Sequence, residues 1–381
     1  MSSFCSMFSQ LLKLFPRTDF QALVKRTKAE RHARGFGSWD QFVAMLFCQL
    51  GRAQSLREIC GGLATCEGKL NHLGIAAPSR STLAYANEHR PWELFEGVFH
   101  ELLAKCQALT AGKKKFRFKN KLVSLDSTVI DLCASLFDWA KFRRTKGAIK
   151  LHLLLDHEGY LPSMAVITEA IQHDIRVART LHFEPGTVLI MDRGYVNYEW
   201  FDRLCRDQVF FVTRLKETAA YEVLDTRPVP NLGRIISDQV IRLRGMQVDL
   251  RRVEVQDPER SRTLVFLTNH LGFAASTIAA VYKDRWQVEL FFKAIKQNLR
   301  IKTFVGTSAN ALKTQVWTAL IAILILRFLQ LRARFGWSLS NLVALLRMNL
   351  FTHRDLWAWL DAPFDEILPL PIPIQGSLSL S

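Results

Sequence analysis

The sequence lacks the cysteine and apolar patterns of secreted and membrane-spanning proteins. Its seven cysteines are odd in number, widely scattered and without a C-x-x-C pair, so we expect reduced thiols in a cytoplasmic protein. A zinc site at Cys60, Cys66 and His72 fits no common ligand spacing. The first 15 residues hold no basic leader before an apolar stretch, and the longest apolar run, 316–326, is too short to cross a bilayer. We therefore expect a buried helix there and no membrane partner.

Acidic residues are outnumbered. The 381 residues include 51 Lys and Arg against 35 Asp and Glu, a formal net charge of +16. An excess of this size indicates a polyanionic partner, most commonly nucleic acid, although ribosome-associated and membrane-surface proteins share it. The chain is 49% hydrophobic, with 26 Phe and 9 Trp, which excludes a wholly disordered protein. At this length we expect two or three domains.

The first third of the chain indicates a series of short helices. Ser38 with Gln41 forms a capping-box pattern before an apolar run, and a second such pattern begins at Ser55. The segment PSRST opens a further helix. Arg80 and Ser81 are our first candidates there for contact with DNA, because amides and hydroxyls at a helix start favour phosphate; an ordinary N-cap explains them as well.

A basic segment, GKKKFRFKNK, follows these helices. Residues 1–120 contain 18 Lys and Arg against 9 Asp and Glu, so they carry more than half of the excess charge. Lys113, Lys114 and Lys115 stand next to aromatic residues, a pattern typical of a segment that follows a phosphate backbone. A solvated linker between domains is the alternative interpretation.

The pattern changes after residue 120. Three strand-like runs are followed by a helix, a strand, a second helix and a strand, which is the order of an RNase H-like α/β fold with a mixed five-stranded sheet and flanking helices. Two alternating runs around a Gly-containing turn, and a third run, predict an inserted β-rich subdomain. The expected divisions are a helical DNA-binding domain at 1–111, a basic linker at 112–120, the first part of the catalytic core at 121–216, the insertion at 217–275, the helical remainder of the core at 276–362 and a Pro- and Ser-bearing tail at 363–381.

Two aspartates follow apolar strands of the expected sheet. Asp126 ends the first strand, in LVSLDST, and Asp192 ends the fourth, in TVLIMD. Either alone is explained by a helix cap or a turn. The first and fourth strands lie side by side in this fold, so the pair predicts one acidic crevice.

A third acidic residue lies on the expected helix 281–299. Tyr282, Arg285, Glu289, Lys293 and Lys296 fall on one helical face. An ordinary amphipathic helix has the same pattern. Two aspartates and a glutamate, however, can hold two hard divalent cations, which activate a nucleophile and stabilise a leaving oxygen. The cations of that face would then bind phosphate.

These motifs resemble the DDE transposases of bacterial insertion sequences, specifically the family-4 group. That group's signature has Tyr, Arg, Glu and Lys at the spacing of Tyr282, Arg285, Glu289 and Lys296. The resemblance implies an N-terminal helical DNA-binding domain and catalytic, metal-binding roles for Asp126, Asp192 and Glu289 with two Mg²⁺ ions, for which Mn²⁺ can substitute. It implies contacts of Tyr282, Arg285 and Lys296 with the backbone of the transposon end near the scissile phosphate. Further candidates for phosphate contact are Arg193, Arg214 and Lys216.

The implied reaction is phosphodiester hydrolysis at the transposon end, followed by attack of the freed 3′-hydroxyl. Relatives form a hairpin and stack a flipped base on an aromatic side chain. Residues 201–285 contain no Trp, which leaves Tyr221, a Phe or Trp286 for that role. The expected partners are double-stranded DNA and a second protomer, in the bacterial cytoplasm at the nucleoid. A structure-specific nuclease, a catalytically silent repressor and a ribosome-binding protein are the alternatives.

Overall fold

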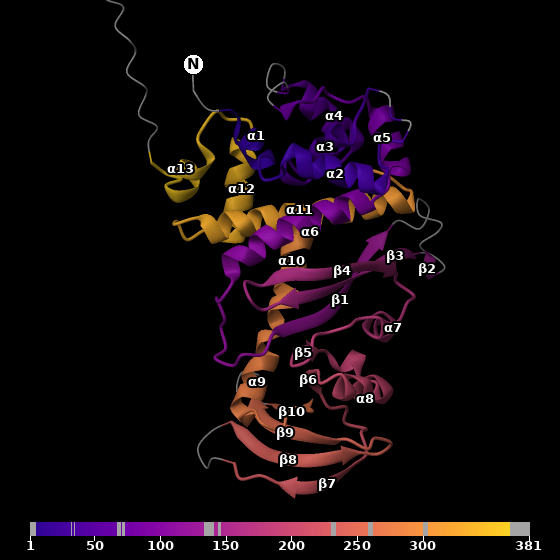
Figure 1. The fold of residues 1–381 in the computed structure, drawn as a ribbon, viewed down its shortest axis with the longest axis vertical. Helices are drawn as coiled ribbons and strands as arrows, with labels where there is room; N and C mark the ends of the chain where they lie inside the picture. Colours follow the sequence, from indigo (N-terminus) through magenta and orange to yellow (C-terminus); the bar gives the residue numbers. More distant parts are fainter. Residues whose placement is uncertain are drawn as a thin grey trace, which may run out of the picture.

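The computed structural model describes residues 5–31, 33, 35–66, 70, 73–132, 141–143, 146–229, 234–257, 262–299 and 304–365. Figure 1 shows a block of helices at one end, a sheet that extends away from it, and two successive helices, α9 and α10, that run along the side of the sheet. The candidate signature residues lie on those two helices and at the single residue between them.

The first third of the chain is helical, as predicted. Its helices are α1 (Met7–Leu12), α2 (Arg17–Thr27), α3 (Ser38–Leu50), α4 (Leu56–Ala64), α5 (Arg80–His89) and α6 (Glu93–Thr110). The capping pattern at Ser55 is confirmed, because its hydroxyl accepts the Glu58 N–H at 3.2 Å. The pattern at Ser38 is wrong. Gly37 is the N-cap of α3, and its N–H donates to Asp40 instead.

The last third forms α9 (Ala275–Asp284), α10 (Trp286–Asn298), α11 (Ala309–Arg332), α12 (Leu339–Asn349) and α13 (Leu356–Asp361). Helix α11 is apolar on all sides and contacts both α3 and α6. It is long and apolar enough to cross a membrane, but 78% of its most apolar window is buried inside the protein. The buried helix predicted over residues 316–326 is therefore confirmed.

The N-terminal and C-terminal helices share one hydrophobic core. That core includes Phe42, Phe99 and Trp317, and it extends to one face of the sheet through Leu153. The chain ends also meet: the Met7 N–H donates to the carbonyl of residue 352 at 3.0 Å. The helical block is thus built from both ends of the chain, rather than from residues 1–111 alone.

The strands form one mixed sheet. They are β1 (Leu122–Leu132), β2 (Lys141–Arg143), β3 (Lys146–Asp156), β4 (Leu161–Glu169), β5 (Val188–Met191), β6 (Phe210–Arg214), β7 (Tyr221–Thr226), β8 (Ile235–Leu243), β9 (Asp249–Asp257) and β10 (Arg262–Thr268). Strands β1, β3 and β4 form an antiparallel meander, and β1, β5 and β6 are parallel neighbours. The core order β4-β3-β1-β5-β6, with the short helices α7 (Asp174–Ala178) and α8 (Tyr198–Arg206), is the predicted RNase H-like arrangement.

The inserted strands continue this sheet. Strand β10 pairs antiparallel with β6, and β9, β8 and β7 follow in order. The strands predicted at β8, β9 and β10 are present, but they do not form a separate sheet. Helix α9 covers this region by packing Ile278 and Val281 against Val253 and Phe266. Strand β7 was not predicted, because all six of its side chains are exposed and show no apolar alternation.

Candidate active site

The two aspartates lie on neighbouring parallel strands. Leu125 of β1 is level with Met191 of β5 in the last pair of their ladder, so Asp126 and Asp192 follow at the same level. The carboxylate of Asp192 accepts the Gly194 N–H at 3.0 Å and caps a short 3₁₀ turn. Asp126 does not end its strand as predicted. Strand β1 continues to Leu132 along β3, past the point where it leaves β5.

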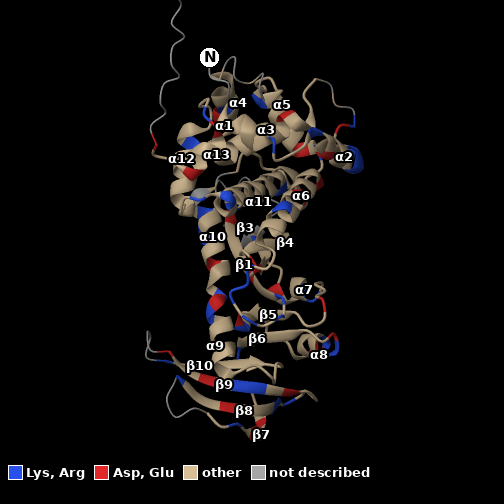
Figure 2. Cartoon of the chain, turned by 60° about the vertical axis from the view of Figure 1, so that its left-hand side comes forward, with Lys and Arg blue, Asp and Glu red and all other residues tan. Residues whose placement is uncertain are grey.

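The expected helix 281–299 is interrupted at Arg285. Helix α9 ends one residue before it and α10 begins one residue after it. Arg285 keeps right-handed helical dihedrals, and its N–H donates to the Tyr282 carbonyl three residues earlier at 3.1 Å. The prediction of one continuous helix is therefore wrong in this detail. The interruption is a single tightened turn of the helix. Figure 2 shows that basic and acidic residues alternate along α9 and α10.

Arg285 joins the carboxylates of the sheet and the helix. Its Nη1 donates to Asp126 Oδ2 at 2.9 Å, and its Nη2 donates to Glu289 Oε1 at 2.5 Å. The guanidinium lies close to the Tyr282 ring, with 5.7 Å from Cζ to the ring centroid. The structure thus brings three of the predicted site residues together around a fourth, the planar cation of Arg285.

Burial dominates the electrostatics of the aspartate on β1. It raises the pKa of Asp126 to about 6, with the charges of Asp192 and Glu289 adding to the increase and Arg285 opposing it. Burial also raises the pKa of the Tyr282 hydroxyl. The three carboxylates are half-buried and repel one another, so they require a positive counter-charge, and Arg285 supplies part of it.

The donor set fits a hard divalent cation. Asp126, Asp192 and Glu289 offer only carboxylate oxygens, which Mg²⁺ and Mn²⁺ prefer. Within the described residues, no three His, Cys, Asp or Glu side chains already converge on one point. The Arg285 guanidinium lies between two of the three carboxylates.

The remaining predicted DNA contacts differ in their surroundings. Lys296 Nζ donates to Thr128 Oγ1 at 2.6 Å and to the Val129 carbonyl at 2.9 Å, so it ties α10 to β1. Lys293 is exposed on α10. Arg193, which follows β5, and Lys216, which follows β6, are also exposed.

Arg214, at the end of β6, is half-buried. Its charge lowers the pKa of the Tyr282 hydroxyl, although burial outweighs that effect. Among the predicted basic residues outside the signature, Arg214 is therefore placed beside the site.

Of the candidates in the first third of the chain, Lys115 lies near the site, where it pairs with Asp284 at 2.5 Å, and the others lie elsewhere. Arg80 and Ser81 are exposed at the start of α5, where the Ser79 hydroxyl accepts the Thr82 N–H at 3.2 Å. This is an ordinary N-cap, in the helical block. Lys113 and Lys114 are exposed in the linker. The zinc candidate His72 lies outside the described residues.

Sequence reasoning missed two groups beside the carboxylates. Ser127 donates to Asp174 Oδ1 at 2.7 Å, and that carboxylate pairs with Lys150 at 3.1 Å. Asp174 only looks like an acidic first-turn residue of a short helix, so no local signal marks it. His157 and Asp284 form the second group. Metal-dependent cleavage needs no histidine, so the sequence gives His157 no functional signal.

Carboxylates at two neighbouring strands and on a following helix, on a sheet of this order, define the RNase H-like class of metal-dependent enzymes that cleave nucleic acids. Within that class the chain belongs to the DDE transposases: the family model described as "Transposase DDE domain" matches residues 117–325. A second model, "Domain of unknown function (DUF4372)", matches residues 5–76. The chain is therefore a metal-dependent DNA transposase of the insertion-sequence type.

Named relatives agree with this assignment. The chain is 32% identical over 312 residues to "Putative transposase y4zB" of Sinorhizobium fredii, covering 79% of this chain and 86% of the relative. It is 28% identical over 259 residues to "Probable transposase for insertion sequence element IS5377" of Geobacillus stearothermophilus, covering 65% and 67%. A solved piggyBac transposase synaptic complex with hairpin DNA is only distantly similar, with a TM-score of 0.44 and 10% identity over 96% of this chain and 86% of that one, and the assignment does not depend on it.

Proposed function

We propose that this transposase belongs to the family-4 group of insertion sequences, binds the terminal inverted repeats of its element, and cleaves and transfers strands with two Mg²⁺ ions. The observation that carries the proposal is the Arg285 bridge between Asp126 and Glu289, beside Asp192. The spacing of Tyr282, Arg285, Glu289 and Lys296 supports the family-4 assignment.

Asp126, Asp192 and Glu289 would hold the cations, which supply a nucleophile at neutral pH and stabilise the leaving 3′-oxygen. The role of the protein is to hold the three carboxylates at the separation and orientation that the cations require. Arg285 compensates their charge in the metal-free protein. Lys293, exposed one turn beyond Glu289, is placed to contact phosphate of the strand that is cut.

Trp286 is our candidate for stacking a flipped base in a hairpin step. Its side chain follows Arg285 directly and is 52% exposed, so an indole face is available next to the carboxylates. Tyr221 lies on the edge strand β7 with Arg252 over its ring, at 5.6 Å from Cζ to the centroid. Figure 1 places β7 at the far end of the insertion from α10.

We also propose that two protomers act on two DNA ends, because excision requires both ends to be cut together. The basic helical block, with Arg80 and Ser81 exposed on α5, and Lys113 and Lys114 in the linker, would hold the inverted repeat, and Arg193, Arg214 and Lys216 would flank the cut strand. A nucleoid-associated protein in the bacterial cytoplasm is the setting that fits these partners.

The test is strand cleavage on a labelled duplex that ends in the element's inverted repeat, with Mg²⁺ or EDTA. We expect Glu289→Gln and Asp192→Asn to lose all detectable cleavage while they still bind the duplex, because each variant removes a metal ligand and leaves the basic surfaces intact. Asp131→Asn, an exposed carboxylate on β1, is the matched control and is expected to cleave normally. Cleavage by either site variant at the wild-type rate contradicts the assignment, and cleavage without strand transfer indicates a nuclease.

A further inference from the structure

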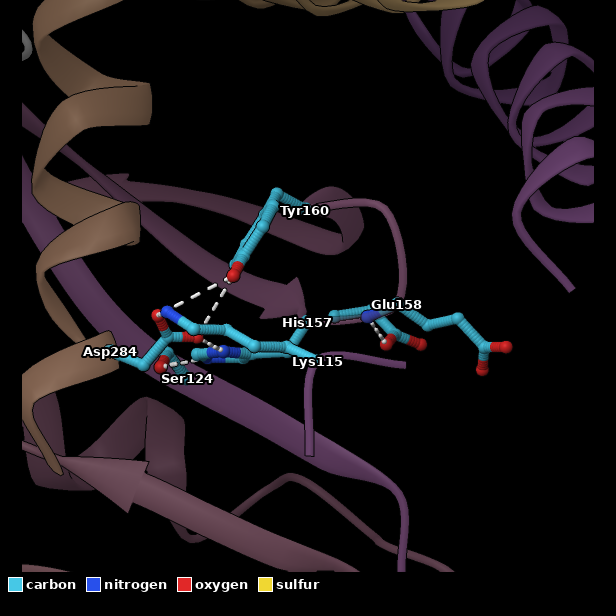
Figure 3. Close-up of polar contacts among 7 residues, drawn as sticks. Lys115, Ser124, His157, Glu158, Tyr160 and Asp284 are labelled. Carbon is cyan, nitrogen blue, oxygen red and sulfur yellow. Dashed lines mark hydrogen bonds and ion pairs between the residues drawn. The ribbon is translucent and has the colours of Figure 1, made fainter. Parts of the chain in front are cut away.

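A second polar cluster lies next to the carboxylates in the chain. Figure 3 shows Ser124, His157 and Asp284 joined in a row. His157 Nδ1 is 2.6 Å from Asp284 Oδ2, and His157 Nε2 is 2.6 Å from Ser124 Oγ. All three side chains are buried, with exposed fractions of 0% for Ser124, 5% for His157 and 4% for Asp284.

The Asp284 carboxylate accepts from three donors, His157 and Tyr160 of the turn after β3 and Lys115 of the linker. Lys115 of the linker approaches its Oδ1 at 2.5 Å, and the Tyr160 hydroxyl donates to its Oδ2 at 3.1 Å. Burial alone would raise the pKa of Asp284, but hydrogen bonds from His157 and Lys115 outweigh it and hold the pKa below the ordinary value. Asp284 is thus ionised, and His157 donates to it through Nδ1.

The order Ser–His–Asp is that of a hydrolytic triad, but Ser124 cannot act as a nucleophile. It lies in the middle of the sheet, paired with Leu155 of β3 on one side and Ile190 of β5 on the other, and no part of it is exposed. A row of hydrogen bonds that substrate cannot reach joins elements instead of attacking a bond.

The elements that it joins are those that carry the catalytic carboxylates. Ser124 and Asp126 are two residues apart on β1, so their side chains leave the same face of the sheet. Asp284 and Arg285 are consecutive at the interruption between α9 and α10. Strand β1 is therefore linked to α9 and α10 by two neighbouring rows of hydrogen bonds. One row is Ser124–His157–Asp284, and the other is Asp126–Arg285–Glu289.

The histidine itself is held firmly. Its backbone N–H donates to the Leu122 carbonyl at 3.0 Å. The turn that follows has left-handed backbone at Gly159 (φ +83°) and Tyr160 (φ +53°), and a Cβ at Gly159 would overlap Thr110 at the end of α6. The backbone of His157 is thus held in one place, and its side chain can therefore hold Asp284 in one place.

We propose that His157 is a positioning residue for DNA cleavage. By linking Asp284 to Ser124, it fixes the position of Arg285 and Glu289 relative to Asp126 on β1. The proposal rests on the metal-dependent cleavage described above. It predicts that loss of the link misplaces a metal ligand without touching the surfaces that bind DNA.

The test compares His157→Gln and Ser124→Ala with wild type. His100→Gln, an exposed histidine of α6 that lies outside the cluster, is the control. We expect the single-turnover cleavage rate to fall about 10- to 100-fold in both test variants, the cost of displacing reacting groups by up to about 1 Å. The Kd for the duplex should stay unchanged, and Mn²⁺ binding measured by electron paramagnetic resonance should weaken. The control should match wild type in all three.

A double-mutant cycle separates positioning from general loss of stability. If His157 acts through Asp284, the double variant His157→Gln with Asp284→Asn cleaves no more slowly than the worse single variant. Multiplied effects, or wild-type cleavage by folded Ser124→Ala, would overturn the proposal. If His157→Gln does not fold, Ser124→Ala decides, because it removes only a hydroxyl. If wild type fails to cut the inverted repeat, the substrate assignment fails and Mn²⁺ binding still tests the link.

Discussion

Arg285 stands between two carboxylates, and Asp126 is the less exposed of them, with 18% of its side chain exposed against 34% for Glu289. The pKa of Asp126 is about 6 in the folded chain, raised mainly by burial, against about 3.9 in an unfolded chain. The folded protein therefore holds this proton more tightly. The stability that follows is complete below pH about 4 and is lost as pH rises through about 6.

Asp126→Asn is accordingly expected to stabilise the metal-free protein at pH 8, by up to about 3 kcal/mol for a shift of roughly two pKa units. At pH 3 the gain should nearly disappear, because Asp126 is then mostly protonated in both states. Thermal unfolding in EDTA at the two pH values measures the difference. Asp131→Asn on the same strand should show no such pH dependence, and a wild type more stable than Asp126→Asn at pH 8 would refute the argument.

At the scale of elements, the insertion depends on one buried ion pair. Arg251 of β9 contacts Asp238 of β8 through Nε at 2.7 Å and Nη2 at 2.6 Å, with side-chain exposures of 4% and 6%. Arg251 also donates to the carbonyls of Leu271 and Phe273, which lie just before α9. The pair therefore holds together two strands and the entry to the helix that leads to Arg285.

Asp238→Asn should cost about 3–5 kcal/mol of unfolding free energy, because it leaves a buried guanidinium without its counter-charge. Asp249→Asn is the control. It removes the partner of Arg242 in a pair whose side chains are 42% and 44% exposed, so a loss below about 1 kcal/mol is expected. Urea denaturation followed by circular dichroism compares them. Equal losses in the two variants would show that burial of the pair does not matter.

Local patterns predicted most elements, and long-range packing explains those that they missed. Alternation and β-branched runs located β1, β3, β4, β5 and β6, and helical spacing placed Tyr282, Arg285 and Glu289 on one face. The interruption at Arg285 was not visible, because a tightened turn leaves the spacing unchanged. Asp284 and His157 were missed because their contact joins residues 127 positions apart.

The sequence likewise did not show which helices make up the helical block. Helix α11 follows the catalytic residues in the chain, and only tertiary contacts show that it packs between α3 and α6. Apolar residues on every side of a helix indicate burial but do not identify the partner. The expected boundary near residue 111 therefore marks a change of pattern, while the core crosses it.

At the scale of the whole molecule, the shared core predicts that the catalytic part does not fold alone. A chain of residues 112–381 would expose the face of α11 that α3 and α6 cover. We expect it to aggregate, or to unfold without a cooperative transition, as a state with secondary structure but loose packing. Thermal scans and near-ultraviolet circular dichroism of the truncated chain test this. Co-expression with residues 1–111 should restore the transition, and a cooperative transition in the truncated chain alone would contradict the prediction.

The contact between the two chain ends also has a consequence for synthesis. The backbone of α1 is hydrogen-bonded to residues 350 and 352, and its helix lies against α13. At about 5–20 residues per second, a ribosome needs roughly 20–70 seconds to make the segment that completes this contact. The first helices leave the ribosome long before their covering helices exist. Premature termination of translation would therefore release a chain whose helical block lacks its C-terminal helices.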